Sequence, residues 1–505
     1  MAINFIPNDP KATSFNTVRR QSALPGSKRS RVGFEFPNLP AQDTYSTNQI
    51  QWLQWQVHQA ANSALRTFEG IHGPIDKWPR SSRAKLLTVF CNQGVDINAY
   101  YDGEDLAFFH YPKGRKNHFT GSSTDVVAHE VGHALLDAIR PQLWDITFTE
   151  VAAFHESFGD CIAILTALSD IDIRRQLVSK NMLSKTNFVE TWGEHLAWMA
   201  GPGFHPRQAL NSLQWSLAGG DPHSFSQVFT GCFYDLIGLE YQAGAKKDQA
   251  ALWRAAKTVA KLLFDGATTA LITPRFYQSV GRVMVLNAGL TTPQASRIRA
   301  AFDGHGIALA SSALTSPRAK VAGTMSQRSA TNWRLSPRAL ADLRGRLGAQ
   351  AGSPLQMRTV NLGGVDLAEA TYARTIQLGQ LQPAFGQVAT DVPEAVLVGA
   401  FGYGTKNATL ATMSPVPDTK STEDEVSDFV AGLIRRHQIE FVTKKAAKSA
   451  QALKVSKHAT SLGVPDALRA ELPRSGVTHR VLERTDGTRL LQRVRFACQC
   501  CGKQS

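Results

Sequence analysis

The sequence lacks the features that mark several large classes of protein. Six cysteines in 505 residues are too few for a disulfide scaffold. No stretch approaches eighteen consecutive apolar residues, so we expect no transmembrane segment. The N-terminus does not show the basic and then apolar pattern of a secretory signal. The sequence therefore predicts a protein that is cytoplasmic as synthesised, with non-classical export left open.

The composition is that of a folded chain with an uneven charge. Hydrophobic residues make up 43% and charged residues 19% of the sequence, as in folded, soluble proteins. Most of the net charge of +14 lies beyond Ala313. A basic region attracts acidic surfaces, so its expected partner is an acidic molecule or a delivery apparatus. A solvated basic surface without a partner stays the alternative, and nucleic acid is not the expected partner.

A chain of this length needs more than one core, and its composition changes at definite points. The sequence predicts an extended basic N-terminal arm over 1–43, a folded domain over 44–310, a linker rich in Ser, Ala, Thr and Arg over 311–337, and a basic C-terminal region of unknown function over 338–505.

The segment STDVVAHEVGHALLDAIRP carries a metal-binding pattern. It opens with residues that favour a helix N-terminus and stops before Pro141. His129 and His133 are four residues apart, so both imidazoles face one side of the predicted helix and suit a single zinc ion. Glu130 lies one step around the helix, where it could reach a water on the metal without being a ligand.

A second segment, 149–165, places Glu156 and Asp160 on one face of another predicted helix. Zinc bonds of about 2.0–2.2 Å require the two helices to pack closely, which small residues such as Ala152 and Gly159 permit. Glu156 is the predicted third ligand and leaves one position open for water. Asp160 is the predicted partner of the free ring nitrogen of a ligating histidine.

HEVGH followed by HESFGD resembles the thermolysin family of gluzincins, in which HExxH is joined downstream by Glu-x-x-x-Asp. The resemblance covers residues 44–310. It implies an α+β, thermolysin-like zinc metallopeptidase domain with an N-terminal mixed β-sheet, the HExxH helix and a helical C-terminal subdomain. The composition change beyond it predicts a separate α/β C-terminal region.

Further segments resemble the substrate-binding parts of the same family. Asn98 and Ala99 look like the edge strand that pairs with an extended peptide. His223 opens a stretch similar to the one that begins with the family's transition-state histidine. Arg207 looks like the arginine that holds the substrate carbonyl after the cleaved bond.

The resemblance implies a metalloendopeptidase, in which zinc lowers the pKa of a bound water towards about 7. Glu130 would take the proton of that water and pass it to the departing amine. His223 and zinc would stabilise the oxyanion.

Several family features are missing. Residues 134–155 contain no tyrosine, and Asp221 lies two residues before His223 where the family has its aspartate five before. The usual calcium ligands are not apparent after Asp160, so calcium is left open beside zinc. Two alternatives therefore remain: a zinc-loaded binding scaffold with weak or no turnover, and an aminopeptidase on the same metal site.

The last residues hold three cysteines, Cys498, Cys500 and Cys501. A structural zinc site usually needs four ligands, so these three would need a distant fourth residue. A metal or redox role and an exposed tail both stay open for them.

Overall fold

The computed structural model describes residues 2–24, 30–309, 337–349, 354–362, 365–381, 383–401, 409–412, 414, 418–441, 477–483 and 487–497. We call residues 2–309 the N-terminal part and the described residues from 337 onward the C-terminal part. The predicted linker lies outside the described residues, except for Pro337, and so do the three terminal cysteines.

The first residues pack against the N-terminal part and do not form the predicted extended arm. β1 (Ala2–Phe5) pairs antiparallel with β2 (Arg19–Ser22). Ile3 is fully buried, and the side chain of Gln56 hydrogen-bonds both the N–H and the C=O of Ile6. The apolar residues here are too few to produce a visible period, which is why the sequence alone indicated an arm.

A mixed sheet lies beside the site, with strand order β18-β5-β6-β4-β3. The sequence pattern predicts a strand over 86–92, a hairpin over 98–109 and another hairpin around Gly487. The first two predictions are confirmed: the strand is β4, and the hairpin is β5 and β6. The strands are β3 (Gly33–Glu35), β4 (Leu86–Phe90), β5 (Ala99–Tyr101), β6 (Asp105–Phe108) and β18 (Phe496–Ala497). The hairpin of β7 (His110–Lys113) and β8 (Lys116–Phe119) follows β6.

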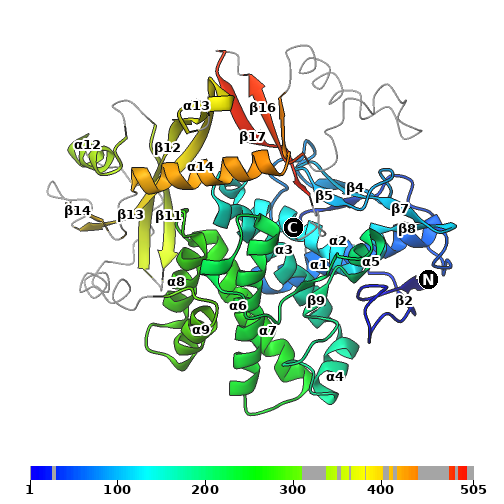
Figure 1. Cartoon of the computed structure of the whole chain (residues 1–505). Helices are drawn as coiled ribbons and strands as arrows, with labels where there is room; N and C mark the ends of the chain where they lie inside the picture. The colour runs from blue at the N-terminus through cyan, green and yellow to red at the C-terminus, as the bar shows by residue number, and fades with distance from the viewer. Residues whose placement is uncertain are drawn as a thin grey trace.

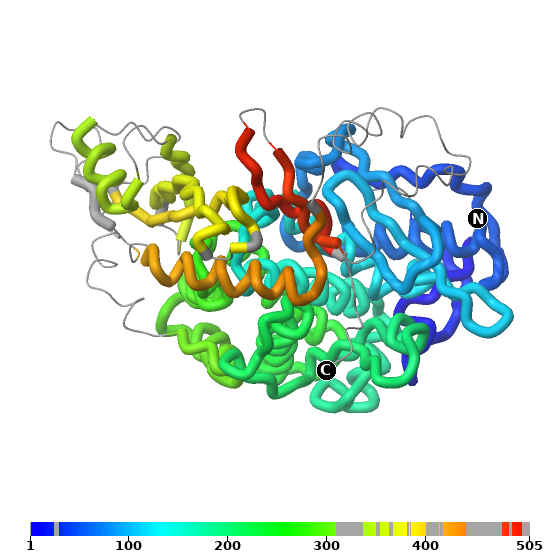
Figure 2. Tube along the Cα trace, turned by 45° about the horizontal axis from the view of Figure 1, so that its top comes forward, coloured from blue at the N-terminus to red at the C-terminus, as the bar shows by residue number. Residues whose placement is uncertain are grey.

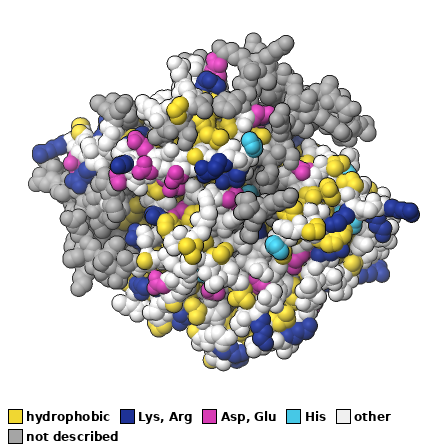
Figure 3. Space-filling view, in the orientation of Figure 1, with side chains coloured by type: hydrophobic (Ala, Val, Ile, Leu, Met, Phe, Trp, Pro, Cys, Tyr) yellow, Lys and Arg dark blue, Asp and Glu magenta, His cyan; other side chains and the backbone are white. Residues whose placement is uncertain are grey.

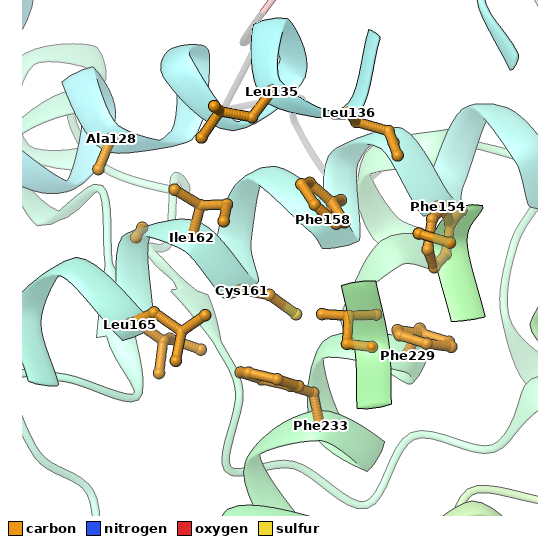
Figure 4. Packing of buried hydrophobic residues seen from close by; sticks show 14 of the residues in the cluster. Ala128, Leu135, Leu136, Phe154, Phe158, Cys161, Ile162, Leu165, Phe229 and Phe233 are labelled. Carbon is orange, nitrogen blue, oxygen red and sulfur yellow. The ribbon is translucent and has the colours of Figure 1, made fainter. Parts of the chain in front are cut away.

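Helices make up the rest of the N-terminal part (Figure 1). They include α1 (Ile50–His72), α2 (Thr124–Ile139), α3 (Thr149–Ser169), α4 (Ile171–Ser179), α5 (Glu194–Ala200), α6 (Pro222–Ala243), α7 (Gln249–Thr269), α8 (Phe276–Ala288) and α9 (Pro293–Asp303). Helix α3 packs against both α2 and α6. Figure 4 shows Leu135 and Leu136 of α2 facing the Phe158 side of α3, with Phe229 and Phe233 of α6 beyond it. The core therefore surrounds the helix that carries Glu156.

Helix α3 is also long and apolar enough to cross a membrane by length and composition alone. Its whole apolar window is buried in the interior of the protein. Burial in the interior of the protein accounts for the many apolar residues of this helix.

The C-terminal part is an α/β unit built on a second sheet, ordered β11-β12-β13-β17-β16-β15. Its elements include α12 (Pro337–Arg346), β11 (Gln356–Leu362), β12 (Val365–Gln377), β13 (Val388–Phe401), β14 (Thr409–Thr412), α14 (Thr419–Arg435), β15 (Ile439–Phe441), β16 (His479–Glu483) and β17 (Arg489–Arg493). The expected hairpin around Gly487 is confirmed as β16 and β17.

This C-terminal part, which the sequence predicts as a separate α/β region, is docked on the N-terminal part. The Arg140 guanidinium lies 3.4 Å from the Glu369 carboxylate, and Glu425 on α14 accepts a hydrogen bond from the N–H of Thr149. In Figure 2 the red β16–β17 hairpin lies between the yellow strands and the blue N-terminal sheet. Sequence patterns report local periodicity, so they did not reveal this contact between distant segments.

Strand β5 is tied to α2 through one buried carboxylate. The Tyr101 hydroxyl donates to Asp137 at 2.9 Å, and Arg80 Nε lies 3.1 Å from the other oxygen. Burial raises the pKa of Asp137 to about 6, although Arg80 and Tyr101 lower it. This contact fixes β5 beside the helix that carries the histidines.

The raised pKa of Asp137 predicts a pH-dependent stability. The folded protein holds the Asp137 proton more tightly than the unfolded chain, so the free energy of unfolding falls as pH rises from about 4 to about 6. Relative to Asp137→Asn, the wild type should lose about 3 kcal/mol over this window, measured by urea unfolding at several pH values. Asp265→Asn, on the surface of α7, is the control. An equal pH dependence in wild type and Asp137→Asn would contradict the prediction.

Candidate metal centre

Helix α2 begins at a capping residue, ends before a proline and has a largely apolar interior. The Ser123 side chain accepts a hydrogen bond from the N–H of Val126 and caps the N-terminus. The helix ends at Ile139, before Pro141, which cannot continue the hydrogen-bond pattern. His129 and His133 therefore lie one turn apart on one face, both fully buried.

Helix α3 brings Glu156 to these two histidines. The Nε2 atoms of His129 and His133 are 3.1 Å apart. Glu156 places one oxygen 3.3 Å from Nε2 of His129 and the other 3.7 Å from Nε2 of His133. A tetrahedral metal ion with bonds near 2.1 Å has ligand atoms about 3.4 Å apart. The structure thus forms a buried group of His129, His133 and Glu156 that could hold a metal ion.

Two glycines allow the helices to approach this closely. A Cβ added at Gly132 would lie 2.7 Å from the Cα of Gly159, and a Cβ added at Gly159 would lie 2.6 Å from Nδ1 of His129. Neither distance is compatible with a side chain without a shift of backbone or ligand. The glycines therefore set the distance between the two sources of ligands.

A second layer of charged groups holds the ligands in place. Nδ1 of His129 lies 2.9 Å from Asp160, the residue predicted to contact it. Arg207 places its two terminal nitrogens 2.8 Å from Asp160 and 3.3 Å from Glu156. Burial alone would lower the pKa of His129, but Asp160 and Glu156 raise it to about 9. The carboxylates thus favour a positive charge here, which a metal ion would also supply.

Glu130 lies beside the candidate ligands, and its carboxylate makes no hydrogen bond with the described residues. It is fully buried, and neither oxygen has a hydrogen-bond partner among the described residues. Burial and the negative charge of Glu156 together raise the pKa of Glu130 to about 8, although the charge of His129 lowers it. A buried carboxyl without partners is costly, so its retention points to a chemical task at this position.

His223, at the start of α6, reaches the same group from another side. Its Nε2 lies 3.5 Å from Glu156, and its Nδ1 lies 3.7 Å from Asp221. Burial alone would lower the pKa of His223, but Glu156 and Asp221 raise it. Asp221 caps α6 through the N–H of Ser224, so the short spacing in sequence still places its carboxylate near the imidazole.

The predicted substrate residues lie at two places. Arg207 is buried against Glu156 and Asp160, whereas Asn98 and Ala99 lie at the start of the edge strand β5. The Asn98 oxygen accepts a hydrogen bond from the N–H of Ala99, and its buried side-chain nitrogen has no partner within the described part of the chain. That nitrogen is a free donor beside the strand edge.

Sequence reasoning missed three rings that pack against the ligands. Trp192 stacks on His129 with ring centroids 4.7 Å apart. His155 stacks on His133, and Phe496 stacks on both His155 and His133. His155 directly precedes Glu156, which was the only signal in the sequence. Trp192 and Phe496 lie far from the HEVGH motif along the chain, so no sequence signal connected them with the site.

A buried acidic cluster also escaped notice. Carboxylate oxygens of Asp9, Asp125 and Glu194 lie within 4.8 Å of one another. Each residue has a buried oxygen without a hydrogen-bond partner in the described structure. Burial raises the pKa of Asp9 to about 6 and that of Glu194 to about 9. Carboxylate oxygens are ligands that Ca²⁺ prefers, so calcium stays open beside zinc.

Comparisons with known proteins add no assignment. No protein-family model matches the sequence, and no curated protein matches it. The residues and their geometry therefore carry the functional argument.

The three ligand residues predict one bound divalent metal ion per chain. His133→Ala should weaken metal binding more than 100-fold, since even contacts outside the ligands change affinity 10- to 100-fold. Equilibrium dialysis with metal analysis measures this. His305→Ala, which removes a buried histidine outside the site, should bind normally, and equal metal affinity in all three proteins would contradict the assignment.

The close helix contact makes a second prediction. Gly159→Ala should displace His129 and lower metal affinity, because the added methyl meets the imidazole. Gly238→Ala on α6 meets open space and should stabilise the helix by about 0.5–1 kcal/mol. Metal titration measures the change in affinity, and thermal unfolding measures the change in stability. Normal affinity in Gly159→Ala would show that the helices need not lie so close.

Proposed function

We propose that this chain is a zinc metallopeptidase that hydrolyses peptide bonds with a thermolysin-like domain over residues 44–310. One observation carries the proposal. Glu130, a buried carboxylate without a described hydrogen-bond partner, lies beside three convergent ligands, His129, His133 and Glu156. A metal site that only stabilises the fold has no need for such a group.

The donor set suits zinc. Two imidazole nitrogens and one carboxylate are ligands that zinc takes in catalytic sites, where three protein ligands leave a fourth position open. Bound zinc would polarise a carbonyl oxygen and lower the pKa of a coordinated water. The contact between Asp160 and Nδ1 of His129 leaves Nε2 of that ring free for the metal.

Glu130 is the proposed general base. Its oxygens face no other described partner, so the carboxylate is free to accept a proton from water and return it to the departing amine. His223 is the proposed donor to the oxyanion, since Glu156 and Asp221 favour its protonated form. Arg207 orients Glu156 and Asp160, and we propose that it also binds the substrate carbonyl.

An extended peptide is the substrate that we propose for the strand beside the site. Strand β5 pairs through its main chain with β18 of the same chain, and a peptide that took the place of β18 would pair in the way that peptides add to a sheet edge. The free side-chain nitrogen of Asn98 could donate to a carbonyl of such a peptide. Main-chain recognition of this kind supports an endopeptidase, with an aminopeptidase on the same metal site as the alternative.

A zinc-loaded scaffold with weak or no turnover is the second candidate. It is favoured by Phe496, a residue of the chain's own C-terminal part that covers the ligand His133. The two candidates differ in one measurable property, because only the peptidase needs Glu130.

Glu130→Gln should retain the metal and lose hydrolysis. The amide cannot take a proton from water, and positioned general bases contribute about 10²–10⁴-fold to rate. The measurement is cleavage of a diverse quenched peptide library by zinc-loaded parent and variant proteins. Glu240→Gln on α6, which pairs with Arg297 outside the site, is the control. A Glu130→Gln protein that cleaves peptides as fast as a measurably active parent would overturn the proposed mechanism.

A further inference from the structure

The substrate edge of the sheet is already occupied by the chain itself. Strand β18 (Phe496–Ala497) pairs antiparallel with β5, with Phe496 opposite Tyr101 and Ala497 opposite Tyr100. This is the edge that the proposed function assigns to an extended peptide. An occupied edge cannot pair with another strand, so β18 and a substrate would compete for the same main-chain groups.

The side chain of Phe496 covers the metal ligands. Its ring stacks on His155 at 3.9 Å and on His133 at 4.7 Å, with interplanar angles of 20° and 14°. Trp144 meets the same ring edge-on at 5.2 Å, and the Arg493 guanidinium lies over it at 4.2 Å. Only 2% of Phe496 is exposed. An aromatic side chain of the C-terminal part thus fills the space beside the ligand set.

The segment is held in this position from both sides. Arg493 Nε donates to the Trp144 carbonyl at 3.0 Å, and the Trp144 indole nitrogen donates to the Arg493 carbonyl at 3.2 Å. The Arg495 guanidinium lies 5.2 Å from the centre of the Tyr100 ring. Segment 493–497 therefore contacts the edge strand and the loop after α2 together.

The C-terminal part also closes the space next to Glu156 and His223. A cavity of about 20 Å³ remains there, which holds about one water molecule. Its C-terminal walls include Phe429, His479 and Arg493. In Figure 3 acidic and basic side chains are interspersed over the described part of the face that is shown.

We propose that residues 493–497 form an intramolecular inhibitory segment that takes the place of a substrate strand and keeps the enzyme latent. This inference rests on the proposed peptidase function. Displacement of β18 and Phe496 from β5 and His133 exposes the edge strand and the ligand set. The partner that activates the protein is one that binds or removes the C-terminal part.

The experiment uses full-length, zinc-loaded protein and the variant Phe496→Ala. Phe385→Ala, which removes an equally buried phenylalanine of the C-terminal part outside β18, is the matched control. Zinc content and circular dichroism establish that each protein is folded. Two quantities are measured: the affinity for a short peptide hydroxamate, by calorimetry, and kcat/KM on a quenched peptide library.

We expect Phe496→Ala to bind the hydroxamate at least tenfold more tightly and to show at least tenfold higher kcat/KM, with Phe385→Ala unchanged. A synthetic peptide LQRVRFA, which reproduces residues 491–497, should inhibit Phe496→Ala, and LQRVRAA should not. The peptide tests the segment even if the substitution perturbs folding.

The outcomes separate the inhibitory segment from the proposed function. Equal hydroxamate affinity in wild type and Phe496→Ala would overturn the inhibitory segment. Equal peptide cleavage by the two proteins would also overturn it and leave the peptidase standing. Tighter hydroxamate binding without cleavage by any variant would support the occlusion and contradict the peptidase.

Discussion

The site depends on the close crossing of α2 and α3. Gly132 and Gly159 leave no room for a Cβ between the helices, and this contact brings Glu156 within 3.3 Å of His129 and 3.7 Å of His133. A wider crossing would separate a one-turn histidine pair from its carboxylate by more than a metal ion can bridge. Asp160 and Arg207 add their contacts only because this distance is fixed.

The crossing of α2 and α3 also buries several ionisable side chains close together. Three carboxylates of the site are buried with two imidazoles and one guanidinium, and buried charges are costly unless paired or bound to metal. Arg207 forms ion pairs with Glu156 and Asp160, whereas Glu130 has no hydrogen-bond partner among the residues described. The site is thus an arrangement that a cation would stabilise, with one carboxylate kept free beside it.

Much of the local structure was predictable from sequence, because helical spacing fixes which side chains share a face. The spacing of His129, His133 and Glu156 led to the correct helices and brought the ligands together. The packed N-terminus, the stacked Trp192 and the edge contact of Phe496 were not predictable. Each depends on residues that lie far apart along the chain, and periodicity carries no information about which distant segments meet. The same limit explains why the docked C-terminal part was expected to be separate.

The central claim is that two imidazoles and one carboxylate bind zinc where α2 meets α3. X-ray absorption at the zinc edge of the full-length protein tests it most directly, because nitrogen and oxygen ligands lie at about 2.0–2.2 Å and sulfur at about 2.3 Å. We expect a four-coordinate shell of nitrogen and oxygen with imidazole scattering, lost in His133→Ala. A shell dominated by sulfur would place the metal at cysteines, and with no zinc bound at all the claim would also fail.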